Sequence, residues 1–180
     1  PVAGGTSRKV QFVYGGDLTS NTALGLTAPD AGPSSSACGP VDAGYVAAPV
    51  GFLCRIVYPG HVAGTADTTR LLYNNKGQLA SIIDPGDERV EFAYTGGVLT
   101  ALWDPLVNDW VAANPADHPR TLLVASEFNY TTDGKIASVK LPAPDGATAS
   151  LRPEKTYDYK TGSTTVDVTD LDLSGAPSGA

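Results

Sequence analysis

The sequence is poor in charge and has no excess of basic residues. Only 17% of its 180 residues are charged, and 12 Lys and Arg against 19 Asp and Glu give a formal net charge of −7 and a pI near 4.6. Nucleic acids and anionic membrane surfaces both attract a basic face. The charge balance therefore argues against both partners. No apolar run reaches the roughly 18 residues of a membrane-spanning helix, so we expect no membrane insertion.

The common catalytic motifs are absent as well. The chain has no Gly-x-Ser-x-Gly elbow, no Walker phosphate loop, no His-Glu-x-x-His and no Gly-x-Gly-x-x-Gly. Its two histidines, His61 and His118, stand apart in predicted loops and lack the spacing of a metal pair. We therefore expect no catalysis and no cofactor. The rival hypothesis, a serine acting with either histidine, has only the histidines in its favour.

Carboxylates gather beside two predicted turns, at Asp84, Asp87, Glu88 and Asp104. Calcium requires about six to eight oxygen ligands, usually from a dense acidic loop, and these carboxylates are too few for such a loop. Aspartate is also common in turns because its side chain accepts hydrogen bonds from nearby backbone amides. We favour the turn over the calcium site and predict no metal.

Cysteine is scarce too, and its two copies, Cys38 and Cys54, are 16 positions apart in a Gly/Pro-rich stretch. No second pair of Cys or His stands near them to complete a zinc site. We predict a disulfide, which would remove roughly 3 kcal/mol of unfolded-state entropy. A disulfide places the protein outside the cytosol, secreted or at the cell surface. The alternative is two buried free thiols.

What the chain does have is an internal repeat. Three segments, 72–85, 93–105 and 129–142, each read tyrosine, a polar turn closed by glycine, an aliphatic residue, a second aliphatic three positions later, and proline. The defining residues are Tyr73, Gly77, Asp84 and Pro85 in one copy, Tyr94, Gly97, Asp104 and Pro105 in the next, and Tyr130, Gly134 and Pro142 in the third. Tyr157 and Tyr159 begin a further, more divergent copy. Such a period indicates an array of one supersecondary unit.

Each copy has the features of a tight β-hairpin. The tyrosine ends a strand, and the Asn, Asp and Gly of the turn tolerate the positive φ that hairpin turns require. Asp-Pro then stops the returning strand, because proline donates no ladder hydrogen bond. We predict an all-β fold, an antiparallel meander of these hairpins. One short helix is expected over 106–113, in an insertion, with Asp104 and Pro105 as its N-cap and first-turn pair.

The predicted organisation has three parts. Residues 1–52 hold an N-terminal strand and a long disulfide-pinned loop packed on the array, residues 53–168 form the repeat sheet, and residues 169–180 form a flexible tail. Trp110, inside the insertion, is the better candidate for contact with a glycan or protein partner, because aromatic side chains are enriched at binding sites. Trp103 is a second candidate, with core packing as its default.

These motifs resemble the YD repeat of the RHS and teneurin families, in which Tyr-Asp, a turn glycine, Leu-x-x-Ile/Val and Asp-Pro-x-Gly recur about every twenty residues. The closest matches are Asp84-Pro85-Gly86 and the segment 157–162, and the resemblance covers about residues 53–168. The chain departs from the pattern where Asn74, Thr95 and Thr131 follow the tyrosines in place of aspartate. The insertion is similar to that of bacterial members.

The resemblance implies a β-sheet that spirals into a hollow shell, which encloses a toxin domain in bacterial members and supports adhesion in teneurins. Three or four copies do not close such a shell, so the implied partners are neighbouring repeats or domains of a larger chain. The family's protease motif has no counterpart here. The expected function is thus a structural β-repeat segment of a secreted or cell-surface bacterial protein. The alternative is a small β-rich module that binds a glycan or a protein.

Overall fold

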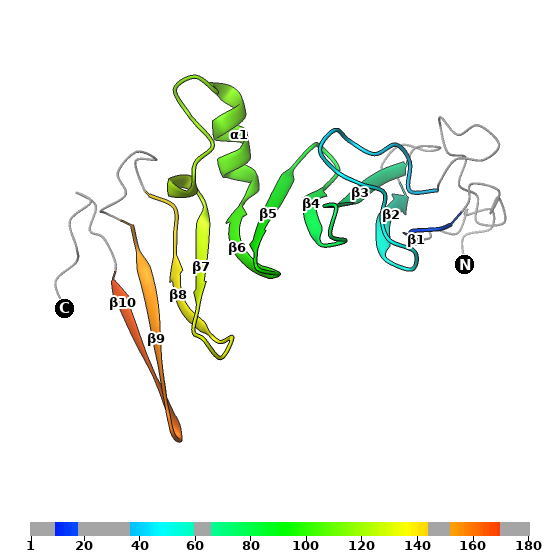
Figure 1. Ribbon diagram of the computed structural model, residues 1–180. Coiled ribbons are helices and arrows are strands. Elements are labelled where there is room, and N and C mark those ends of the chain that lie inside the picture. Colours follow the sequence, from blue (N-terminus) through cyan, green and yellow to red (C-terminus); the bar gives the residue numbers. More distant parts are fainter. Residues whose placement is uncertain (1–9, 18–36, 60–65, 144–151, 170–180) are drawn as a thin grey trace, which may run out of the picture. The chain divides into compact units, whose positions relative to one another are not determined.

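A computed structural model of the chain describes residues 10–17, 37–59, 66–143 and 152–169. They form ten β-strands and one α-helix, and within each of the two units below the strands pair antiparallel with their neighbours in chain order (Figure 1). The prediction of an all-β antiparallel meander with one short helix is confirmed. The chain divides into two compact units, Pro1–Arg89 and Val90–Ala180.

The first unit contains four strands. They are β1 (Gln11–Tyr14), β2 (Leu53–Pro59), β3 (Ala66–Tyr73) and β4 (Leu79–Ile83). β1 pairs with β2, β2 with β3 and β3 with β4. His61 and the rest of the connection 60–65 lie outside the described residues.

The second unit contains the other strands and both helical segments. The strands are β5 (Arg89–Thr95), which begins at the unit boundary, β6 (Val98–Trp103), β7 (Ser126–Tyr130), β8 (Ile136–Lys140), β9 (Glu154–Lys160) and β10 (Ser163–Thr169). The α-helix α1 (Pro105–Ala113) and the 3-10 turn η2 (Leu122–Val124) lie between β6 and β7 (Figure 1). Asp104 Oδ1 accepts a hydrogen bond from the amide of Val107 at 2.9 Å, so the predicted N-cap is present. The predicted tail lies outside the described residues beyond Thr169.

Four hairpins share one register. In each, the tyrosine pairs with the aliphatic residue that follows the turn glycine by two positions, and the next pair skips one residue of the returning strand. The tyrosine pairs are Tyr14–Leu53, Tyr73–Leu79, Tyr94–Leu99 and Tyr130–Ile136, and the skipped residues are Cys54, Ala80, Thr100 and Ala137. One extra residue on one strand is a β-bulge. The repeated motif therefore specifies a bulged hairpin.

The bulge explains why the two aliphatic residues of the motif are three positions apart. In a regular strand, residues three apart point to opposite faces. With the extra residue between them, Leu79 and Ile82 pair with Tyr73 and Leu71, which are two apart on β3 and share a face. The same four positions in the other copies are Tyr14, Phe12, Leu53 and Ile56; Tyr94, Phe92, Leu99 and Leu102; and Tyr130, Phe128, Ile136 and Val139. We call this side of each unit the tyrosine face.

The turns close in the same way in three of these hairpins. The amide after the tyrosine donates to the carbonyl of the residue after the turn glycine: Gly15 to Phe52 at 2.8 Å, Asn74 to Gln78 at 2.9 Å and Thr131 to Lys135 at 2.8 Å. Gly77 and Gly134 have φ of 74° and 83°, a region that L side chains rarely adopt. The glycine is thus required by the backbone of the turn.

The core of the first unit lies where residues 37–52, here called the cysteine lobe, pack on β1 and β2. Buried Val13, Cys54 and Val57 contact Ala37, Cys38 and Ala48. A disulfide joins Cys38 to Cys54, with 5.6 Å between the Cα atoms, as the sequence predicts. The lobe also adds backbone to the sheet, because the amide of Val46 donates to the carbonyl of Tyr73 at 2.8 Å.

In the second unit a buried arginine joins several elements of the structure. Arg152 has 5% of its side chain exposed and pairs with Glu127. Its guanidinium also donates to the carbonyls of Leu141 at 2.8 Å and Ala125 at 2.6 Å. Ala125 and the neighbouring Val124 and Ala143 are buried. Arg152 thus links η2 and the ends of β7 and β8.

Candidate functional site

The tyrosine hydroxyl joins one copy of the repeat to the next. Tyr73 on β3 donates to the carbonyl of Leu53 on β2 at 2.6 Å, and Tyr159 on β9 donates to the carbonyl of Ile136 on β8 at 2.9 Å. Leu53 and Ile136 occupy the same motif position, the first aliphatic of the preceding copy. Burial raises the pKa of Tyr73, in keeping with a protonated hydroxyl that donates.

The tyrosine ring also contacts the preceding copy. The rings of Phe52 and Tyr73 meet edge to face at 5.8 Å, and the ammonium of Lys135 lies 5.1 Å from the ring centroid of Tyr159. Phe52 and Lys135 both follow the turn glycine of their copies. Edge-to-face and cation–π contacts of this kind each add of the order of 1 kcal/mol. One junction geometry therefore recurs in both units.

The register between copies agrees with these contacts. The pairs Arg55–Arg70, Ala101–Glu127 and Ser138–Thr156 join the copies. In all three junctions, the residue three positions before the tyrosine thus lies opposite the residue four positions after the turn glycine. The junction is specified by the strands, because the side chain that follows the glycine differs each time.

The position after the tyrosine supplies a hydrogen-bond acceptor to the turn. Asn74 Oδ1 accepts from the amides of Lys76 at 2.9 Å and Gln78 at 3.0 Å. Thr131 Oγ1 accepts from the amide of Lys135 at 3.0 Å. Asparagine and threonine therefore do here what a carboxylate oxygen of aspartate would do. At Asn74 and Thr131 the departure from the Tyr-Asp pattern therefore keeps an acceptor for the turn amides.

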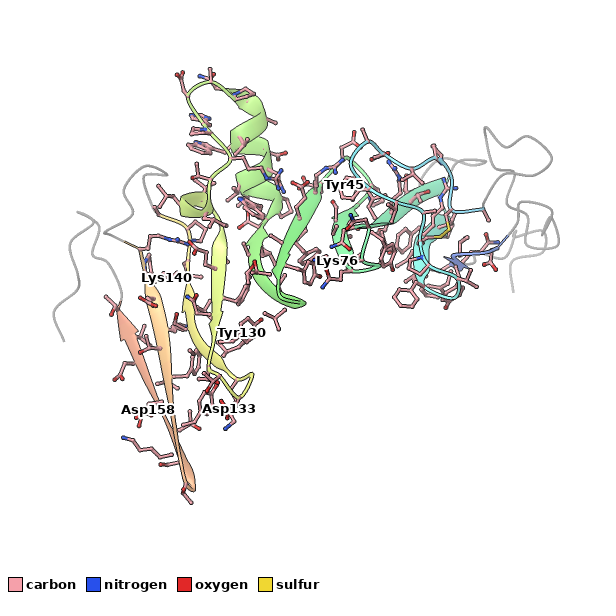
Figure 2. The ribbon with its side chains drawn as sticks, in the orientation of Figure 1. Tyr45, Lys76, Tyr130, Asp133, Lys140 and Asp158 are labelled. Atoms are coloured by element: carbon pink, nitrogen blue, oxygen red, sulfur yellow. A yellow bond between two sulfur atoms is a disulfide. The ribbon has the colours of Figure 1, made fainter. Side chains whose placement is uncertain are left out.

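Asp133 lies in the turn between β7 and β8 (Figure 2). Its carboxylate forms an ion pair with Lys135 in the same turn. Hydrogen bonds from Lys135 and then from Thr131 lower the pKa of Asp133 from 3.8 to about 2. The same carboxylate raises the pKa of Lys135. Both side chains are more than half exposed, so the pair contributes little to stability.

The remaining motif residues lie at strand ends and turns. Asp84 accepts from Thr69 Oγ1 at 2.6 Å, and its backbone closes the turn through Pro85 to Glu88. Gly97 has φ of 91°, and Pro105 is the first residue of α1. Pro142 follows β8, and Tyr157 lies within β9 opposite Val166. Burial raises the pKa of Tyr94. These residues lie in the strands and turns of the repeat or, for Pro105, at the start of α1.

The two tryptophans have separate partners. Trp103 Nε1 donates to the carbonyl of Thr121 at 3.2 Å, and the guanidinium of Arg120 lies 4.8 Å from the Trp103 ring centroid. Trp110 stacks on His118, with 3.8 Å between centroids and 10° between planes. His118 covers one face of the Trp110 ring, so only the other face is open to the glycan or protein partner that the sequence analysis considered. Leu106, 79% exposed, is the most accessible apolar side chain of α1.

The cysteine lobe brings together charged residues that the sequence analysis did not single out. Arg55 and Arg70 pair directly across β2 and β3, where like charges repel. Asp42 of the lobe contacts Arg70 at 2.5 Å and Arg89 at 3.8 Å, which offsets part of this repulsion. Desolvation, and then the charge of Arg70, lower the pKa of Arg55. A hollow of about 290 Å³ lies beside the lobe, lined by both cysteines, Arg70 and Leu72 among others.

Sequence reasoning also missed one complete copy of the repeat. Tyr14 pairs with Leu53 as the other motif tyrosines pair, and Gly51, Leu53 and Pro59 have the spacing of Gly77, Leu79 and Pro85. The copy was hidden because residues 15–50 stand where the other copies have a short turn. The spacing from glycine through leucine to proline is the signal that finds it.

No protein-family model matches the chain, and the comparison with curated proteins gives no match either. Among the residues that the structure describes, no group of three or more His, Cys, Asp or Glu side chains is placed to hold a metal ion. Within the same residues, no helix has the length and apolar character needed to cross a membrane. The feature that recurs in both units is the tyrosine face with its junctions.

Proposed function

We propose that this chain is a structural β-repeat segment of a secreted or cell-surface protein of the RHS/YD-repeat type. In this proposal the segment contributes to a β-shell that encloses or presents a toxin or adhesion domain. It performs no catalysis itself. Its partners are neighbouring repeats or domains of a larger chain.

The observation that carries the proposal is the recurring junction, in which a tyrosine hydroxyl binds the carbonyl of the preceding copy. Tyr73 and Tyr159 make this bond in the two units, although the residues they stack on differ. The hydroxyl bonds a backbone carbonyl, which every copy has whatever its side chains. The same junction can therefore join any number of copies, as an extended repeat sheet requires. The disulfide between Cys38 and Cys54 supports the extracytosolic location.

The tyrosine face supports the same conclusion. Each copy places four apolar or aromatic positions on this face, and most of their side chains are half-buried. A sheet face of this composition is typical of a surface that packs on something, such as the interior of a shell. A catalytic role would instead require convergent polar groups in a cavity.

One observation favours a second candidate, a glycan- or protein-binding module. α1 contains no buried residue, and Trp110 and Leu106 lie on it. An exposed helix with apolar side chains is a common protein-binding element. In the binding module the insertion contacts the partner, whereas the structural role requires no such contact. A binding test of the insertion therefore distinguishes the two functions.

The proposed function is tested by two measurements. The coding sequence on either side of this segment should contain further copies of tyrosine, glycine, aliphatic and proline at the spacing found here. A glycan array and a pull-down with labelled protein should show no binding that Trp110→Ala abolishes, with Trp103→Phe as the matched control. Flanks without repeats, together with binding lost in Trp110→Ala, would replace the structural role with the binding module.

A further inference from the structure

Two arginines of the first unit lie on the face of the sheet opposite the tyrosine face. Because Cys54 is a bulge residue, Arg55 pairs with Val13, which stands between two tyrosine-face residues of β1. Neighbouring residues of a strand point to opposite faces, so Arg55 and its partner Arg70 on β3 share the other face. The cysteine lobe packs on this same side, where it contacts Val13 and Cys54. The sheet therefore places the arginines next to the lobe.

Arg55 lacks the ion-pair partner that Arg70 and Arg89 have in Asp42. Among the described residues, the Arg55 guanidinium has no ion pair or hydrogen bond, and its Nε is buried. A buried nitrogen of a charged group that makes no hydrogen bond costs free energy. An anion brought to this guanidinium would offset part of that cost.

The Arg55 guanidinium lies beside the hollow next to the cysteine lobe. Gly39 lines the hollow, and a Cβ atom added at Gly39 would lie 3.9 Å from Nη1 of Arg55. Arg70 lines the hollow as well. Directly opposed residues of antiparallel strands have Cβ atoms about 5 Å apart, so the two guanidinium groups can reach one ligand. This side of the hollow is therefore basic.

Two carboxylates of the described residues lie close to this basic side, and both are engaged. Asp17 lines the hollow, and its Oδ2 accepts a hydrogen bond from the amide of Tyr14 at 2.9 Å. Asp42 contacts Arg70 at 2.5 Å and Arg89 at 3.8 Å. The three arginines thus outnumber the carboxylates, although the whole chain has a net charge of −7. This local excess of positive charge favours an anionic ligand.

The rest of the hollow is mostly apolar. Its apolar lining includes Val41, Val46, Ala47, Ala48 and Leu72, together with the cysteines of the disulfide. Small-molecule sites commonly combine an apolar wall with a few polar groups that orient the ligand. The volume of about 290 Å³ is small for such a site, so it suits a ligand of few atoms.

We propose that the hollow binds a small monocarboxylic acid with an apolar body. The carboxylate of this ligand pairs with Arg55 and Arg70, because a guanidinium presents two parallel N–H donors that match the two oxygens of a carboxylate. The apolar body packs against Val46, Leu72 and the disulfide. The inference goes beyond the proposed function, since the site lies on the face opposite the tyrosine face and takes no part in the repeat junction.

A titration with three probes tests the ligand chemistry. Benzoate is the probe, benzamide is a neutral molecule of similar shape, and acetate is a carboxylate without the apolar body. Benzoate added to the ¹⁵N-labelled chain at constant ionic strength should shift the amide signals of Gly39, Ala47 and Leu72 until they saturate. Benzamide and acetate should each bind about tenfold more weakly. Equal affinities for benzoate and benzamide, or no saturable shift at these amides, would overturn the proposal.

Variants at Arg55 test the charged contact. Arg55→Gln should weaken benzoate binding about tenfold, and Arg55→Lys should retain part of the affinity. Arg55→Gln removes one of two opposed like charges, so the fold should persist, which thermal unfolding checks. Lys76→Gln makes the same change of charge in the turn between β3 and β4, outside the lining of the hollow, and should bind like the parent chain (Figure 2). Equal weakening by Arg55→Gln and Lys76→Gln would overturn the site.

A variant that fills the hollow tests the apolar contact. Ala47 is exposed and lines the hollow, so Ala47→Leu should weaken benzoate binding about tenfold and leave acetate binding unchanged. Ala43→Leu is the matched control, because Ala43 is an exposed alanine of the same lobe outside the lining. Unchanged benzoate affinity in Ala47→Leu would contradict the site. A chain that binds no benzoate but whose flanks encode further repeats would overturn this inference and leave the proposed function in place.

Discussion

The hairpin that joins β1 to β2 and the hairpin that joins β7 to β8 have the same register and unlike turns. Residues 15–50 separate Tyr14 from Gly51, whereas residues 131–133 separate Tyr130 from Gly134. The amides of Gly15 and Thr131 nevertheless donate to Phe52 and Lys135 at the same distance, 2.8 Å. The comparison shows that the strands, and not the turn, set the bulged register.

The two units also differ in what fixes the additions to their sheets. In the first unit a covalent bond holds the cysteine lobe to the bulge residue Cys54. In the second unit the guanidinium of Arg152 holds η2 and the strand ends through Glu127 and carbonyl oxygens. Cys54 is the bulge residue of its copy, whereas Arg152 lies between two copies, ahead of β9. The repeat thus provides the sheet, and each unit stabilises its own insertion by different chemistry.

The largest expected effect is the loss of the arginine in the second unit. Arg152→Met should lower the free energy of unfolding by about 3 kcal/mol, because Glu127 and several carbonyls lose their buried donor. Lys160→Met is the control, since Lys160 and its partner Asp158 are both more than half exposed and the loss should cost less than about 1 kcal/mol. Urea denaturation followed by tryptophan fluorescence measures both. Equal costs for the two variants would show that Arg152 stabilises this unit no more than an exposed ion pair does.

Removal of the disulfide should have a nearly equal effect, confined to the first unit. Cys38→Ala with Cys54→Ala should cost about 3 kcal/mol, the entropy of closing a loop of this length. Hydrogen exchange should then speed up at Val13 and Gly15 and stay unchanged at Phe128. Exchange that speeds up equally in both units would contradict the claim that the disulfide stabilises the first unit alone.

The tyrosine junctions should differ between the units by their burial. Tyr73→Phe leaves the carbonyl of Leu53 without its donor in a covered site, so we expect a loss of about 1–2 kcal/mol. Tyr159, 38% exposed, lies where water replaces its hydroxyl, and Tyr159→Phe should cost about 0.5 kcal/mol. Thermal unfolding of the two variants gives the comparison. A larger loss from Tyr159→Phe than from Tyr73→Phe would contradict the expectation that the more buried junction contributes more to stability.

The smallest effect concerns Asp133 in the turn between β7 and β8. Its pKa is lower in the folded state than its ordinary value of 3.8, so its contribution to stability is present above pH 4 and is lost as the pH falls towards about 2. Asp133→Asn should flatten the stability profile in that window. Unfolding measured from pH 5 to pH 2 at low salt tests this, and identical profiles for Asp133→Asn and the parent would refute it.

Much of the fold could be predicted from the sequence because the repeat is local. Tyrosine, turn glycine and Asp-Pro fix where a strand ends, turns and stops, and the helix start at Asp104-Pro105 is a local signal too. The bulge was not foreseen, although the spacing of three between Leu79 and Ile82 encodes it. A strict two-residue alternation would place them on opposite faces.

The rest depends on residues far apart in the chain. Tyr14 and Leu53 pair across the lobe, and Arg152 reaches Glu127 from a segment with no motif. The ring contact of His118 with Trp110 was likewise hidden, because the connection after α1 has no periodic pattern. Local patterns predict the hairpins. The side chains that pack on the hairpins come from distant parts of the chain, and no local pattern predicts them.

The central claim is that hairpins with unlike turns adopt one bulged register. Scalar couplings across hydrogen bonds, measured by NMR between amide nitrogens and carbonyl carbons, test it most directly. The account predicts couplings from Gly15 to Phe52, from Asn74 to Gln78 and from Thr131 to Lys135. A coupling from Gly15 to a different carbonyl, or a Gly15 amide that exchanges freely with solvent, would contradict it.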